Sequence, residues 1–79
     1  MTRNTDAKLR RYLVRRFARH LKRRRQERGI TQEELALLAG LAPENISHLE
    51  RKKHGPTLIV CFKISQALNM TVSEFLEGF

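Results

Sequence analysis

The sequence predicts an all-α domain, a compact bundle of about five helices, and three observations support this prediction. Apolar residues recur every three or four positions along most of the chain, which is the spacing of one helix face. Two segments begin with a threonine followed three residues later by a glutamate, a pair that satisfies free amide groups at a helix start. A glycine or an asparagine follows three of the apolar stripes, where helices commonly end. A chain of 79 residues leaves room for a single domain, 1–79.

The first helix is expected from about Lys8 to Arg28, closed by Gly29 in a left-handed conformation. Its apolar stripe repeats every four residues and consists of Leu9, Leu13, Phe17 and Leu21. Residues 1–7 lack periodicity and are expected to form a loose polar arm. Residues 1–16 together form a basic N-terminal extension that runs into this helix.

Residues 31–50 carry the densest set of local signals in the chain. Thr31 and Glu34 have the spacing of a capping box, so a helix is expected to begin at Gln32. Its apolar stripe is Leu35, Ala36 and Ala39. Gly40 can adopt the positive φ that a sharp turn needs, and Pro43 suits the first turn of a second helix. The segment therefore predicts a helix-turn-helix.

The second helix of this pair, residues 43–49, has a buried side and a polar side. Ile46 and Leu49 supply the buried stripe. The outward face is polar and consists of Glu44, Asn45, Ser47 and His48. A B-DNA major groove admits a helix, and there asparagine pairs with adenine while glutamate accepts a hydrogen bond from cytosine. For each of these residues the alternative is a solvated position or a phosphate contact.

The frame from about Phe17 to Leu76 resembles the Cro and phage-repressor type of helix-turn-helix regulators, also called the XRE family. The matching positions are Gln32, Ala36, Gly40, Ile46 and Leu49. The resemblance implies a lambda-repressor-like fold and a transcriptional regulator that binds double-stranded DNA. It also implies a homodimer on a palindromic operator, acting as a compact repressor or a restriction-modification controller. Without the resemblance, the segment would be an ordinary helical hairpin in a small bundle.

The resemblance assigns DNA-binding positions to the start of the helix-turn-helix, to the helix of residues 43–49, which would be the reading helix, and to the basic loop after it. These positions are Thr31, Gln32, Pro43, Glu44, Asn45, Ser47, His48, Arg51, Lys52 and Lys53. Gln32 is expected either to touch phosphate or to brace the reading helix, and the basic loop is otherwise a solvated charged loop. The resemblance also implies a partly buried structural ion pair between Arg25 and Glu50.

Two residues depart from the family pattern. Ala42 stands where members often have a serine cap, so the reading helix lacks a side-chain acceptor worth about 1 kcal/mol. Lys52 replaces a frequent glycine after that helix, so a strained or differently shaped turn is expected there.

The C-terminal half predicts two further helices. Pro56 and Thr57 begin a fourth helix that ends with Asn69 in a left-handed conformation, and a capping box at Thr71 opens a short last helix. Leu58, Phe62 and Leu68 are expected to face the core. Apolar residues beyond that stripe predict a dimer interface, which consists of Ile59, Val60, Phe75, Leu76 and Phe79.

The net charge of +8 is concentrated in one part of the chain. Residues 1–28 hold twelve of the sixteen basic residues and two of the eight acids, which gives +10 there and −2 in residues 29–79. Such a field favours phosphate-rich partners. The role of the basic extension stays open between a DNA-contacting arm, a dimerisation element and a longer solvated helix.

The sequence offers no support for an enzyme. The three histidines lack metal-ligand spacing and no glycine-rich phosphate loop is found, so no catalytic residue, metal, cofactor or small-molecule ligand is expected. Cys61 is the single cysteine, which favours a reducing compartment, and no apolar run suits a membrane span. The expected location is the cytoplasm, in association with the nucleoid.

Two alternative functions remain. An antitoxin-like autorepressor would bind a second protein at equal stoichiometry. The basic amphipathic helix of residues 8–28 also suits an RNA-binding or membrane-surface module, although the scarcity of free aromatic residues leaves no base-stacking platform.

Overall fold

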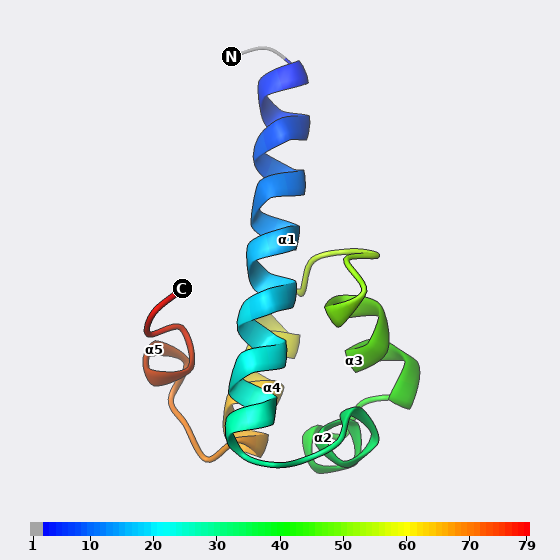
Figure 1. Cartoon of the computed structure of the whole chain (residues 1–79), viewed down its shortest axis with the longest axis vertical. Coiled ribbons are helices and arrows are strands. Elements are labelled where there is room, and N and C mark those ends of the chain that lie inside the picture. The colour runs from blue at the N-terminus through cyan, green and yellow to red at the C-terminus, as the bar shows by residue number, and fades with distance from the viewer. Residues whose placement is uncertain (1–2) are drawn as a thin grey trace.

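The computed structural model describes residues 3–79, with side chains from residue 5 onward. This part of the chain forms five α-helices and no strand, as the all-α prediction requires. The helices are α1 (Arg3–Glu27), α2 (Gln32–Ala39), α3 (Pro43–Glu50), α4 (Leu58–Ala67) and α5 (Val72–Phe75). Figure 1 shows α1 as the long vertical helix, with α2 and α3 on one side of it and α5 on the other.

The first helix is longer than the sequence suggested. It begins at Arg3 and not near Lys8, so most of the expected loose arm is helical. The carboxylate of Asp6 lies in the first turn, where it complements the positive end of the helix dipole. The N-terminal half of α1 extends beyond the other four helices (Figure 1). Leu9 and Leu13 are exposed for this reason, so only the C-terminal part of the expected apolar stripe, Phe17 and Leu21, is buried.

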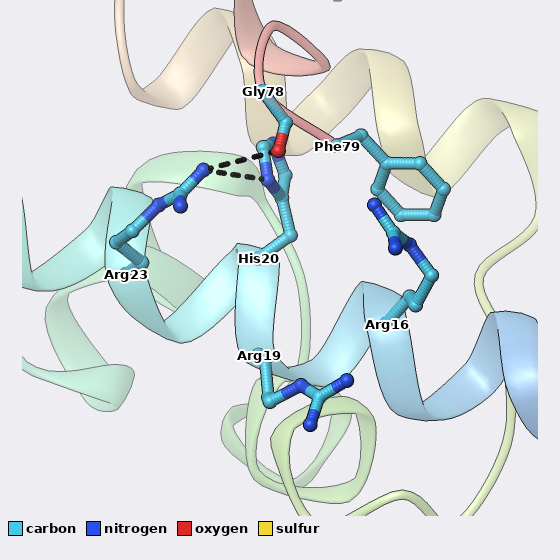
Figure 2. A pocket seen from close by; sticks show the side chains of 6 residues that line it. All are labelled: Arg16, Arg19, His20, Arg23, Gly78 and Phe79. Atoms are coloured by element: carbon cyan, nitrogen blue, oxygen red, sulfur yellow. Dashed lines mark hydrogen bonds between the residues drawn. The ribbon is translucent and has the colours of Figure 1, made fainter.

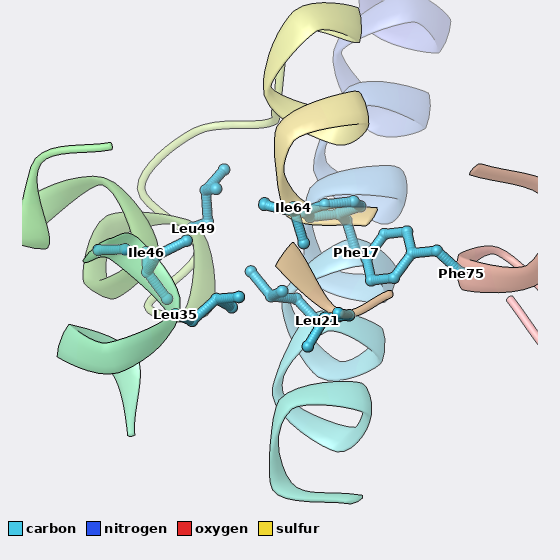
Figure 3. Close-up of a cluster of buried hydrophobic side chains, with 9 residues drawn as sticks. Phe17, Leu21, Leu35, Ile46, Leu49, Ile64 and Phe75 are labelled. Carbon is cyan, nitrogen blue, oxygen red and sulfur yellow. The ribbon is translucent and has the colours of Figure 1, made fainter. Parts of the chain in front are cut away.

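The core forms where the C-terminal half of α1 meets the other four helices. Its members come from all five helices and are Phe17, Leu21, Leu35, Ala36, Ile46, Leu49, Ile64, Leu68 and Phe75. Figure 3 shows α1 and α4 contributing from one side, α2 and α3 from the other, and Phe75 reaching in from α5. Ala36 is fully buried, and its small side chain lets the helices approach closely. This packing fixes α3 against the bundle.

Helix starts and ends follow the expected local signals. Thr31 and Thr71 form complete capping boxes with the glutamates three residues later. Gly29 and Gly40 have φ values of 69° and 68°, and Asn69 takes the expected left-handed exit at 58°. These conformations reverse the chain sharply, which brings successive helices against each other.

The fourth helix is rotated relative to the prediction. Thr57 caps α4 and the helix itself begins at Leu58. Ile64 and Leu68 face the core, while Leu58 and Phe62 are 71% and 51% exposed. The prediction that Leu58 and Phe62 face the core is therefore wrong, and both side chains add to an apolar surface.

Candidate nucleic-acid interface

The turn between α2 and α3 presents α3 at the surface. Gly40 ends α2 with its amide bonded to the carbonyls of Ala36 and Leu37. Pro43 then occupies the first turn of α3, where its missing N–H costs nothing. Ala42, the residue before it, makes no side-chain cap, as the sequence indicated. The start of α3 is consequently held by packing and backbone contacts.

The outer face of α3 is polar. Pro43, Glu44 and His48 are exposed, and Asn45 and Ser47 are half-buried on the flanks of the helix. The opposite face carries the core residues Ile46 and Leu49. A helix with one face locked into a core holds the other face in a fixed orientation, as base recognition requires.

The end of α3 is fastened to α1 and α2 through the carboxylate of Glu50. Arg25 donates from Nε and Nη2 to this carboxylate at 2.7 and 2.9 Å, so the expected ion pair is present in bidentate form. Gln32 donates to the same carboxylate at 3.0 Å, so it links the start of α2 to the end of α3. The side chains of Arg25 and Glu50 are 11% and 3% exposed. Their hydrogen bond raises the pKa of Arg25 further above its usual value.

Thr31 and the start of α2 lie beside this network. The Thr31 hydroxyl accepts from the Glu34 amide at 3.0 Å, and the Thr31 amide donates to the Glu34 carboxylate at 2.8 Å. These two bonds lower the pKa of Glu34 below its usual value. The Thr31 amide is thus engaged in the capping box, whereas its hydroxyl, which accepts there, keeps its O–H free to donate to a phosphate.

The loop after α3 is basic and exposed. Arg51, Lys52 and Lys53 all project into solvent. Lys52 has a φ of 64°, a left-handed conformation that is strained for any residue other than glycine. The Lys53 amide donates to the His48 carbonyl at 2.9 Å, and the rings of His48 and His54 pack edge to face at 6.0 Å. The loop therefore has a defined shape next to the outer face of α3.

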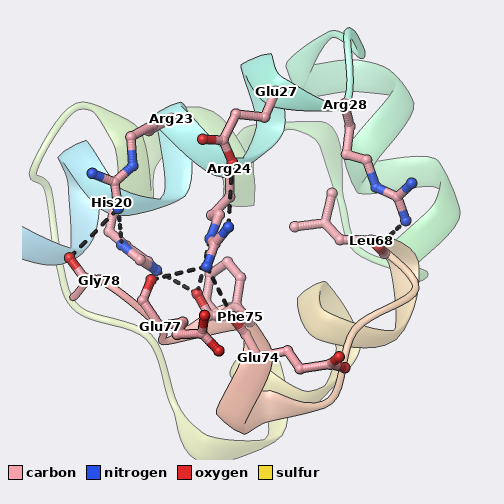
Figure 4. Close-up of polar contacts among 10 residues, drawn as sticks. All are labelled: His20, Arg23, Arg24, Glu27, Arg28, Leu68, Glu74, Phe75, Glu77 and Gly78. Atoms are coloured by element: carbon pink, nitrogen blue, oxygen red, sulfur yellow. Dashed lines mark hydrogen bonds and ion pairs between the residues drawn. The ribbon is translucent and has the colours of Figure 1, made fainter.

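Arg24, near the end of α1, and Arg28, just after it, bind backbone carbonyl groups of the C-terminal half. Arg24 donates to the carbonyls of Glu74 and Glu77 at 2.9 Å each, and Arg28 donates to the Leu68 carbonyl. Figure 4 shows Arg24 at the end of α5 and Arg28 apart from it, beside Leu68 at the end of α4. They donate to free carbonyl groups at the C-terminal ends of two helices, α5 for Arg24 and α4 for Arg28. Part of the positive charge in residues 1–28 is therefore structural.

His20 also binds a carbonyl group at the end of α5, a role that the sequence did not predict. Its Nε2 donates to the Phe75 carbonyl, and its Nδ1 accepts from Arg23 at 3.3 Å. Burial lowers the pKa of His20 below its ordinary value, and this effect outweighs the opposing hydrogen bond to Phe75. Figure 2 shows His20 between Arg23 and Phe79. His20, Arg24 and Arg28 recur every four residues in the sequence, but this spacing does not indicate which carbonyl groups they contact.

The residues expected at a dimer interface do not share one environment. Ile59 and Leu76 are 67% and 37% exposed, and Val60 is half-buried against the core. Phe75 is 0% exposed, so it is a core residue and its assignment to a surface was wrong. Phe79 packs within the chain, with its ring 5.5 Å from His20 and under the guanidinium of Arg16. That intramolecular site for Phe79 was not foreseen.

The described residues contain no group of three or more His, Cys, Asp and Glu side chains suited to a metal ion. No helix among them is long and apolar enough to cross a membrane. Cys61 is half-buried, and burial raises the pKa of its thiol. The thiol is thereby kept in its less reactive protonated form.

Comparison with known proteins identifies relatives of the chain. A helix-turn-helix family model matches residues 21–75. An HTH-type transcriptional regulator of Sinorhizobium fredii is 37% identical over 54 residues, which cover 68% of this chain and 70% of the relative. An HTH-type transcriptional regulator of Methanothermobacter thermautotrophicus is 40% identical over 48 residues, covering 61% of this chain and 70% of the relative.

Solved structures show the same fold. The restriction-modification controller protein C.AhdI from Aeromonas hydrophila superimposes with a TM-score of 0.78 at 27% identity, over 84% of this chain and 96% of that one. A point mutant of the restriction-modification controller protein C.Esp1396I gives a TM-score of 0.79 at 30% identity, over 85% and 87%. The five helices, the geometry of the turn between α2 and α3, and these similarities all indicate the same family. The chain belongs to the XRE-type helix-turn-helix family of DNA-binding transcriptional regulators.

Proposed function

We propose that the protein regulates transcription as a homodimer that reads a palindromic operator through the outer face of α3. The observation that carries this proposal is the rigid presentation of that face. Ile46 and Leu49 hold α3 in the core, and the Arg25–Glu50 ion pair holds its end. An α-helix with side chains is about 10–12 Å across, which matches a major groove about 12 Å wide.

Base reading is assigned to the outward side chains of α3. His48 and Glu44 are exposed at the centre of the face, and Asn45 lies at its edge. The amide of Asn45 suits adenine N6 and N7, and the carboxylate of Glu44 suits cytosine N4. Ser47 and Pro43 complete the surface that would enter the groove.

Phosphate contacts are assigned to the two ends of the helix-turn-helix. Arg51, Lys52 and Lys53 follow α3 and are exposed. At the other end, the N-terminus of α2 carries the positive pole of its helix dipole next to Thr31 and Gln32. Backbone contacts of this kind set the position of the protein on duplex DNA, and base contacts then supply the sequence preference.

The proposed partner for dimerisation is a second copy of the chain. Leu58, Ile59 and Phe62 form an exposed apolar strip on α4, and Leu76 lies just after α5. Exposed apolar patches on a small charged protein commonly mark association surfaces. A two-fold pair joined there would present two copies of α3, and a symmetric operator would place its half-sites about 34 Å apart.

Among regulatory roles, the structural similarity to two restriction-modification controller proteins favours a controller role. A protein with that role would act in the cytoplasm, at the nucleoid.

Selection of binding sites from random duplex DNA, followed by sequencing, tests the proposal. The expected result is a palindromic consensus. A selected pool without a shared motif would contradict sequence-specific reading, and a single asymmetric motif would contradict the two-fold dimer.

The dimer surface is tested separately by sedimentation. Ile59→Glu is expected to yield monomers at tens of micromolar protein, where the wild type sediments as a dimer. Leu37→Glu is a matched control, because Leu37 is 81% exposed on α2 and lies outside the apolar strip. Sedimentation of the Ile59→Glu variant as a dimer would exclude this interface.

A further inference from the structure

A basic groove lies between the N-terminal half of α1 and the loop that follows α3. Its volume is about 500 Å³, and six of the residues that line it are basic or histidine: Arg10, Arg11, Arg15, Lys52, Lys53 and His54. The first three come from α1 and the last three from the loop. The groove therefore joins the long basic extension to the loop beside the reading helix.

The charges in this groove are unbalanced. Asp and Glu are absent from the described residues that line it. Arg10, Arg11 and Arg15 form no ion pair within the described chain, in contrast to Arg24 and Arg25 farther along the same helix. Five formal positive charges gathered without a counter-charge repel one another, and a polyanion in the groove would relieve that repulsion.

The neighbouring loop indicates which polyanion fits. Lys52 and Lys53 belong to the groove and also follow α3 directly, so a duplex read by α3 would pass the mouth of the groove. Arg11 and Arg15 are four residues apart and share one face of α1, with a rise of about 6 Å between them. Phosphates in one DNA strand advance about 3.4 Å each along the axis, so the two guanidinium groups span about two phosphates.

We propose that this groove binds the sugar-phosphate backbone of DNA flanking the segment read by α3. The inference rests on the proposed function of α3, and it assigns the basic extension as a second, sequence-independent contact. Residues 3–16 span about 20 Å of helix, which sets the added reach at no more than about six base pairs per protomer.

The test compares two duplexes, one ending at the selected operator and one carrying six more base pairs on each side. The wild type is expected to bind the longer duplex more tightly. Arg11→Gln combined with Arg15→Gln should remove this gain and flatten the slope of log K against log salt by about two units per protomer. At 0.15 M salt, that loss corresponds to about 30-fold in affinity per protomer, since each contact contributes about fivefold relative to 1 M salt.

Two controls make the result specific. Arg11→Lys combined with Arg15→Lys retains both charges and should retain the slope. Lys63→Gln removes a charge from the exposed surface of α4, outside the groove, and should leave the flank effect unchanged. Circular dichroism checks that the variants stay folded, which is expected because Arg11 and Arg15 are exposed and glutamine is a good helix former.

The outcomes separate the two proposals. If the wild type selects an operator but gains nothing from flanking DNA, the groove assignment is overturned while α3 keeps its role. Failure to select any operator overturns both. Binding through Arg11 and Arg15 to vesicles with one third anionic lipid, without any gain from flanking DNA, would assign the groove to a membrane surface and would also overturn the inference.

Discussion

Removal of the Arg25 guanidinium should destabilise the protein far more than removal of an ordinary surface charge. Arg25 donates twice to Glu50 and once, at 2.8 Å, to the Ile30 carbonyl. In an Arg25→Met variant, the Glu50 carboxylate stays almost fully buried and keeps only the Gln32 hydrogen bond among those described. A buried carboxylate without its counter-charge is costly because water no longer solvates it.

The expected loss is about 3–5 kcal/mol in the free energy of unfolding, the range for breaking one side of a buried ion pair. A domain of 79 residues has a total stability of about 4–12 kcal/mol, so this single change removes a large fraction of it. Replacing both members, with Arg25→Met and Glu50→Leu together, should recover part of the loss because no charge is then left buried.

Urea unfolding followed by circular dichroism at one fixed protein concentration measures these differences. Glu27→Ala is the matched control. Glu27 pairs with Arg24 at 3.3 Å but is 54% exposed, so its removal should cost less than about 1 kcal/mol. If Arg25→Met costs no more than Glu27→Ala, the ion pair does not hold α3 as described.

Three further predictions concern stability and DNA binding. Ala42→Ser should stabilise α3 by about 1 kcal/mol by adding the missing cap, and an unchanged urea midpoint would contradict this. Lys52→Gly should relieve the left-handed strain and raise stability by about 1 kcal/mol, yet flatten the salt dependence of DNA binding by about one unit. His20 has a lowered pKa in the folded state, so the unfolded state binds more protons and stability should fall as pH drops below about 6.5. His20→Gln should reduce this decline between pH 7 and 5.5, whereas the exposed His54→Gln control should keep it.

The helix-turn-helix could be predicted from sequence because its signals are local. Thr31 with Glu34 and the positive-φ glycine at Gly40 fix the ends of α2 through neighbouring residues only. The alternation of buried and polar positions then places Ile46 and Glu44 on opposite faces of α3. Such features depend little on the rest of the fold.

Other features depend on contacts between distant residues. The run Leu58–Phe62 is apolar all round, so periodicity could not decide which side of α4 faces the core. Arg24 meets carbonyls about fifty residues later in the chain, and no local pattern announces such a pairing. The exposure of Leu13 likewise follows from the length by which α1 exceeds the bundle.

Competition binding between the selected operator and random duplex DNA tests the central claim most directly. Asn45→Ala and His48→Ala are each expected to lose about 1–3 kcal/mol of discrimination, with random-DNA affinity nearly unchanged. Gln66→Ala, an exposed polar position on α4, should retain full discrimination. Full discrimination in both α3 variants would contradict reading of DNA by the outer face of this helix.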